Sequence, residues 1–161
     1  MACASASRER VALEAAEDAL ADGCVLAEFR IAPLLFGAFG VAPETTVEAL
    51  VAGPRRSALP SGLIVCAMRQ LPPEQTERAA RLALAYRSQG VLGFDLAGPE
   101  LGYPPALHAS ELKLVRDAGL GITLHAGEAD SSQRVLEAAE LGPTRIGHGV
   151  RLADALTQTG G

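Results

Sequence analysis

The segment GITLHAGEAD, residues 121–130, holds an imidazole and a carboxylate at a spacing that suits metal-assisted hydrolysis. An apolar run ends in His125, and the small residues Ala126 and Gly127 let the chain turn so that Glu128 faces the same cavity. A neutral imidazole nitrogen can hold Zn²⁺, and a neighbouring carboxyl group can carry a proton. The pattern H-x-x-E also fits a structural interpretation, with His125 as a hydrogen-bonded strand end and Glu128 in the first turn of a helix.

The segment RIGHGV, residues 145–150, places His148 between two glycines. Minimal backbone bulk on both sides suits the close approach of a ligand or of a metal-bound water. A satisfied histidine in a tight turn explains the same pattern, so the residues alone leave both interpretations open.

The segment VLGFDLAGPE, residues 91–100, ends an apolar run at Asp95 and continues into Gly98. Gly98 has no side chain to block a ligand from its backbone N–H, although a turn glycine before Pro99 is the simpler interpretation. A metal-free hydrolase with Asp95 and Glu128 as a carboxylate pair is a further alternative, which requires a defined separation of the two groups.

Two other sets of polar residues have structural interpretations. Glu28 and Arg30 are two apart and therefore share one face of a strand, which predicts a structural ion pair. His108 follows two prolines at the expected start of a helix, which predicts a surface residue.

These residues are carried by apolar runs that alternate with helical patterns. We expect strands at residues 24–31, 62–68, 91–96, 121–125 and 145–148, and helices at 8–22, 43–51, 73–89, 108–118 and 131–141. The alternation predicts an α/β fold with βαβ units and a parallel sheet. Neither a dinucleotide-binding nor a P-loop glycine motif follows any run, and the polar residues gather at the ends of the runs, as in (β/α)8 barrels.

Composition narrows the class of protein. The chain has 161 residues, 48% of them hydrophobic and 20% charged, which predicts a single globular domain over residues 1–161. A net charge of −5 provides no basic surface for nucleic acid. Three cysteines without a C-x-x-C pair argue against a disulfide framework, and no run is apolar enough for a leader peptide or a membrane span. We therefore expect a cytoplasmic protein with a small-molecule partner.

Four segments together resemble the adenosine deaminase family: LHAGEA, RIGHGVR, GFDLAG-x-E and A-E-F-R-x-x-P (residues 27–33), in the family's order and at about its spacing. The resemblance implies a zinc-dependent aminohydrolase of purine nucleoside salvage that converts adenosine or a related 6-aminopurine nucleoside to an inosine-type product and ammonia. His125 is similar to the zinc-binding histidine and Glu128 to the acid that protonates purine N1. His148 is similar to the histidine that orients and deprotonates the zinc-bound water, and Gly98 to the glycine whose N–H meets purine N3.

The sequence departs from the family pattern in its metal ligands, because it contains neither an H-x-H pair nor a T-D-D-P-like segment. Pro99 also stands where the family often has an acidic residue. We therefore expect a partial barrel of about five strands, without the first and the last two, that carries only part of a site for one Zn²⁺. The alternative is an inactive fragment or degenerate paralogue that needs a partner to complete its barrel. Exposed sheet edges would also permit self-association.

Overall fold

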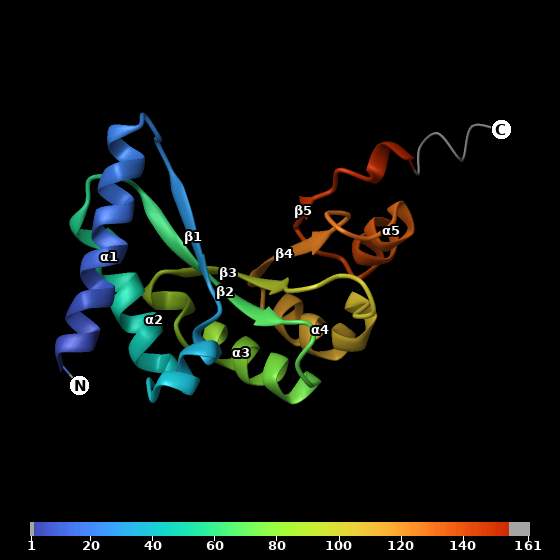
Figure 1. Cartoon of the computed structure of the whole chain (residues 1–161), viewed down its shortest axis with the longest axis horizontal. Helices are drawn as coiled ribbons and strands as arrows, with labels where there is room; N and C mark the ends of the chain where they lie inside the picture. The colour runs from blue at the N-terminus through green and yellow to red at the C-terminus, as the bar shows by residue number, and fades with distance from the viewer. Residues whose placement is uncertain (1, 155–161) are drawn as a thin grey trace.

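The computed structural model describes residues 2–154, which form one parallel sheet with helices between its strands (Figure 1). The sheet has five strands in sequential order, β1 to β5. They are β1 (Ala27–Ile31), β2 (Ser61–Met68), β3 (Val91–Ala97), β4 (Gly121–Ala126) and β5 (Arg145–His148). All neighbouring pairs are parallel, so the five predicted strands and the α/β class are confirmed.

Five α-helices occupy the predicted places: α1 (Ala2–Ala21), α2 (Pro43–Ala52), α3 (Pro73–Ala85), α4 (Ala109–Asp117) and α5 (Ser132–Glu140). Four 3-10 helices were not predicted: η1 (Pro33–Phe39), η2 (Pro54–Arg56), η3 (Arg87–Gln89) and η4 (Pro105–His108). Three of them begin at a proline, whose fixed φ suits a first helical turn and which lacks the N–H that this turn leaves unpaired. The predicted helix 73–89 is therefore two elements, α3 and η3, followed by Gly90 at a φ of 108°.

The hydrophobic core lies between the sheet and the helices that cover one of its faces. Phe94 and Leu96 of β3 are fully buried, as are Ala79 and Ala83 of α3. Small residues on α3 let this helix pack closely on β2, while α4 packs on β4. The helices thereby bury one face of the central strands.

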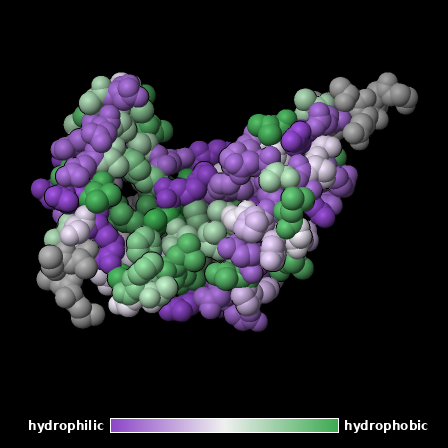
Figure 2. Space-filling model, in the orientation of Figure 1, coloured by the Kyte–Doolittle hydropathy of each residue, from purple (hydrophilic) through white to green (hydrophobic). Residues whose placement is uncertain are grey.

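The other face of the sheet is open and concave. Figure 2 shows the molecule hollowed between the α1/β1 end and the β5 end, with hydrophilic residues at the base of the hollow. An ion pair of 2.6 Å between Glu28 on β1 and Arg145 on β5 joins the two edge strands across this face. In a flat sheet these strands would lie roughly 19 Å apart, beyond the reach of two side chains, so the sheet curls as part of a barrel does.

This ion pair corrects the expectation for Glu28 and Arg30, which do not pair with each other. The two side chains share one face of β1, as predicted, but each reaches a different strand: Glu28 binds Arg145, and Arg30 binds Asp95 of β3. Glu28 also lies near the start of β1 rather than at its carboxyl end, so it belongs to the floor of the concave face.

Beyond β5, residues 152–154 form a helical turn. The final residues, including TQTGG, lie outside the described residues. No helix in the described range 2–154 has the length and apolar character needed to cross a membrane.

Candidate active site

His125 is held at the carboxyl end of β4 by two partners on neighbouring strands. Its Nδ1 donates to Oδ1 of Asp95 at 2.9 Å, and Nη1 of Arg30 lies 3.2 Å from its Nε2. A guanidinium group can only donate hydrogen bonds, so the Nε2 atom must be the acceptor and Nδ1 must carry the proton. The carboxylate of Asp95 therefore fixes the tautomer of His125 and directs the Nε2 lone pair into the concave face.

Asp95 is a buried anchor and not a solvent-facing acid. Its side chain is fully buried, and its second oxygen, Oδ2, forms an ion pair of 3.1 Å with Nε of Arg30. The Sγ atom of Cys66 lies 3.8 Å from the same oxygen. Burial, together with this carboxylate, raises the pKa of the Cys66 thiol far above its usual range, which keeps the thiol protonated. Both oxygens of Asp95 are thus engaged within the sheet.

His148 and Glu128 complete a cluster with His125. The rings of His125 and His148 lie 5.1 Å apart between centroids, and Nε2 of His148 is 3.3 Å from Oε2 of Glu128. The backbone of His148 has a φ of 65°, the single positive value among the described non-glycine residues. This left-handed conformation ends β5 abruptly and is uncommon for a residue with a Cβ. The three predicted residues are thereby brought together from β4, the β4–α5 loop and β5.

Gly98 lies outside this cluster, on the loop that follows β3. Its φ is 99°, and a Cβ atom at this position would lie 2.3 Å from Oε1 of Gln70. The left-handed backbone conformation favours glycine here, whereas the exposed Gln70 side chain could move away from a larger residue. No contact between Gly98 and the two histidines is present in the described part of the chain.

His108 is not a surface residue, as the sequence suggested, but one of the largest fully buried side chains. Its Nε2 lies 2.9 Å from the backbone oxygen of Arg69. The Arg69 side chain, also buried, donates from Nη2 to the backbone oxygens of Leu96 at 2.9 Å and of His125 at 2.5 Å. His108 and Arg69 therefore tie the ends of β2, β3 and β4 together, immediately behind His125.

Sequence reasoning missed the parts played by Asp95, Arg30, Arg69 and Glu100. Asp95 and Glu100 stand in the segment GFDLAGPE, and Arg30 in AEFR, so the motifs contained them without indicating what they touch. A charged residue directly after an apolar strand, such as Arg69, was the available signal for a buried polar role.

Zinc fits the site only in part. The Nε2 atom of His125, with its tautomer set by a carboxylate, is the arrangement seen in metal-binding histidines. Within the part of the chain that the structure describes, however, no group of three histidine, cysteine, aspartate or glutamate side chains can hold a metal ion. A catalytic zinc usually has three protein ligands, so the described residues do not form a complete zinc site.

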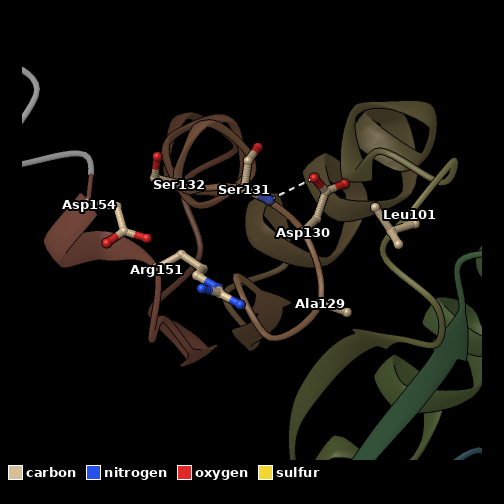
Figure 3. Close-up of a pocket in the computed structure, with 7 residues that line it drawn as sticks. All are labelled: Leu101, Ala129, Asp130, Ser131, Ser132, Arg151 and Asp154. Atoms are coloured by element: carbon tan, nitrogen blue, oxygen red, sulfur yellow. Dashed lines mark hydrogen bonds between the residues drawn. The ribbon is translucent and has the colours of Figure 1, made fainter.

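A shallow hollow of about 620 Å³ begins directly beyond Glu128, between the loops that follow β3, β4 and β5. Figure 3 shows its lining residues, Leu101, Ala129, Asp130, Ser131, Ser132, Arg151 and Asp154. The hollow does not contain His125 or His148, so we place the candidate chemistry at the histidine cluster and treat the hollow as its rim.

A parallel, curled sheet with polar side chains gathered at the carboxyl ends of its strands is the architecture of barrel enzymes. Comparison with known proteins gives the particular family. The family model described as adenosine deaminase matches residues 1–157. The chain belongs to the adenosine deaminase family, whose members are aminohydrolases.

Individual relatives agree with this assignment. An adenosine deaminase from Mycobacterium marinum is 41% identical over 155 residues, which cover 90% of this chain and 42% of the relative. A zinc-bound amidohydrolase from Burkholderia ambifaria superposes with a TM-score of 0.88 at 28% identity, over 93% of this chain and 43% of that protein. Adenine deaminase from Arthrobacter aurescens gives a TM-score of 0.85 at 25% identity, over 93% and 47% of the two chains. The chain thus spans less than half the length of these relatives, and its fold is a half-barrel of their type.

Proposed function

We propose that this chain is part of a zinc-dependent aminohydrolase that deaminates adenosine or a related 6-aminopurine nucleoside by hydrolysis. One observation carries the proposal: His125, Glu128 and His148 meet at the carboxyl ends of adjacent parallel strands, at the distances given above. Family membership supports the reaction class, and the chain then acts as one partial-barrel domain that carries part of the site.

In this proposal His125 supplies one zinc ligand through its Nε2 atom. Zinc, when bound, lowers the pKa of a water molecule toward neutrality. Asp95 holds the imidazole in the required tautomer, and the bond from Arg30 to Nε2 must give way when the ligand position is used. The side chain of Arg30 is 38% exposed, so it has room to move toward solvent.

Glu128 and His148 transfer protons in this proposal. The Glu128 side chain is 61% exposed and projects from a loop, where it can donate a proton to N1 of a purine ring and make C6 more electrophilic. His148, whose Nε2 faces Glu128, orients the attacking water and removes its proton. Gly98 offers its backbone N–H to purine N3 when the exposed side chain of Gln70, which lies against Gly98, moves aside.

The substrate is a small purine. Solved relatives from Arabidopsis were crystallised with IMP and with GMP, and another relative is an adenine deaminase. The net charge of −5 disfavours a nucleic-acid polymer. Cys24 and Cys66 are both free thiols, which supports a reducing compartment such as the cytoplasm.

The test is to measure zinc content and ammonia release from adenosine with the purified chain. In a completed barrel, replacement of Glu128 by Gln should abolish the release of ammonia and leave the zinc content unchanged, because Glu128 is not a ligand in this proposal. Glu140→Gln is the matched control, since Glu140 is an exposed residue at the end of α5 and carries the same charge. Full activity of Glu128→Gln would contradict the assigned role.

A second candidate is a chain that is inactive until a partner completes its barrel. It is favoured by the lack of a three-ligand cluster within the described residues, and by β1 and β5, each of which pairs with a strand on one side alone there. Under this candidate the isolated chain binds no stoichiometric zinc and releases no ammonia. Self-association through the strand edges would appear as a dimer or larger species in sedimentation.

A further inference from the structure

The carboxylate of Glu100, on the loop after β3, binds the backbone of the loop after β4. Its Oε2 atom accepts from the N–H groups of Gly127 at 2.9 Å and Asp130 at 3.2 Å, and its Oε1 atom accepts from the N–H of Glu128 at 3.1 Å. These bonds link two loops that are almost thirty residues apart in the sequence. They also satisfy three N–H groups that belong to neither a helix nor a strand.

The carboxylate is buried and lies near a buried cation. Glu100 is 4% exposed, and Arg69, which is 2% exposed, lies behind the same loops. Burial lowers the pKa of Arg69, and Glu100 is the foremost of the carboxylates whose charge opposes this shift. A buried charge is costly unless hydrogen bonds or opposite charges compensate it, and Glu100 accepts three backbone hydrogen bonds and interacts electrostatically with Arg69.

Apart from its backbone bond to Glu100, Glu128 has few contacts in the described part of the chain. Its side chain is mostly exposed and contacts His148 at 3.3 Å, while its main chain follows Gly127, which has a φ of 75°. Glu100 therefore holds the backbone N–H of Glu128, and this bond fixes the backbone position from which the exposed Glu128 side chain extends.

We propose that Glu100 positions Glu128 for catalysis. This role rests on the proposed function of Glu128 as the proton donor. A carboxylate is required for it, because both oxygens accept hydrogen bonds. A glutamine of the same shape has one acceptor oxygen and one NH₂ donor. Its oxygen can replace Oε2, but the NH₂ group then faces the N–H of Glu128, which loses its partner.

Amide hydrogen exchange by NMR tests this on the chain as it exists. In the wild type, the amides of Gly127, Glu128 and Asp130 are expected to be protected from exchange although they lie in a loop. In Glu100→Gln, exchange at Glu128 should accelerate by about tenfold or more, which corresponds to one lost charge-assisted hydrogen bond. The amides of Ile122 and Leu124 within β4 should exchange as before, and Glu140→Gln is the control of equal charge change.

A second readout reports the position of the Glu128 side chain. The nuclear Overhauser effect between the Glu128 side chain and the His148 ring should weaken in Glu100→Gln, while the effect between the rings of His125 and His148 persists. Unprotected amides in the wild type would overturn the proposal without any variant. Uniform acceleration along β4, or an unchanged Glu128 amide in Glu100→Gln, would overturn it as well.

The outcome is independent of the activity assay. Glu128→Gln keeps its backbone N–H, so the protection of the three amides should persist in that variant. If the chain releases no ammonia but exchange responds as expected, the proposed reaction fails while Glu100 still positions the loop. If ammonia is released and exchange does not respond, the reaction stands and the role of Glu100 is wrong.

Discussion

The replacement Asp95→Asn tests the arrangement around His125 most directly. Asp95 is fully buried; its Oδ1 accepts a hydrogen bond from Nδ1 of His125, and its Oδ2 forms an ion pair with Nε of Arg30. Asparagine has the same shape but one acceptor, so one of the two donors must face an NH₂ group. If the amide oxygen faces His125, Arg30 loses its partner. If it faces Arg30, His125 must change tautomer, and its Nε2–H then opposes Nη1 of Arg30.

The expected cost is that of one hydrogen bond to a charged group, about 1.5–3 kcal/mol. Because the Arg30 side chain is 38% exposed and can return to water, we expect the middle of this range, about 2 kcal/mol. With a urea m-value of about 2 kcal/mol/M, the midpoint of unfolding should fall by about 1 M. Circular dichroism in urea measures this shift. The control Asp117→Asn removes an exposed pair with Lys113 and should leave the urea midpoint almost unchanged.

A double-mutant cycle separates the Arg30–Asp95 interaction from a nonspecific loss of stability. Arg30→Met should be costly in the wild type and nearly neutral in Asp95→Asn, with a coupling energy of roughly 1–2 kcal/mol. If Asp95→Asn unfolds within about 0.5 kcal/mol of the wild type, or if the two costs simply add, the account of Asp95 as a shared acceptor is refuted.

Three further outcomes follow from individual contacts. Long-range ¹H–¹⁵N spectra should show His125 as the Nδ1–H tautomer, and a signal for Nε2–H would contradict its contacts. Gly98→Ala should lower the free energy of unfolding by about 1–2 kcal/mol because its φ is 99°, whereas Gly37→Ala, which has open space and an ordinary φ, should be nearly neutral. The hydrogen bond to Glu48 raises the pKa of Tyr86 from 10.0 to about 12, so the folded state holds this proton more tightly than the unfolded state. That contribution to stability is present below pH 10 and disappears as pH rises toward 12. In urea titrations, the wild type should therefore lose this stabilisation between pH 9 and pH 11, and Glu48→Gln should not show this loss.

The sequence predicted those candidate residues of the site that stand within a motif at the end of a strand. His125, Glu128 and His148 each follow an apolar run, and parallel strands bring their carboxyl ends to one edge, so their convergence follows from the order of the elements. The environment of His108 was not predictable in this way. A histidine after two prolines is usually exposed, and it is buried here because η4 turns its ring toward the backbone of Arg69.

Local apolar patterns and motifs in the sequence were enough to predict the alternation of strands and helices, the family and the side chains to which the proposed function assigns roles. The tertiary structure alone decided the partners. The curl of the sheet brings Glu28 to Arg145 and Arg30 to Asp95, and the pairing of β3 with β4 brings Glu100 to the loop of Glu128. Residue spacing along one strand cannot reveal that curl, since it arises from the twist between neighbouring strands and from the helices packed on one face.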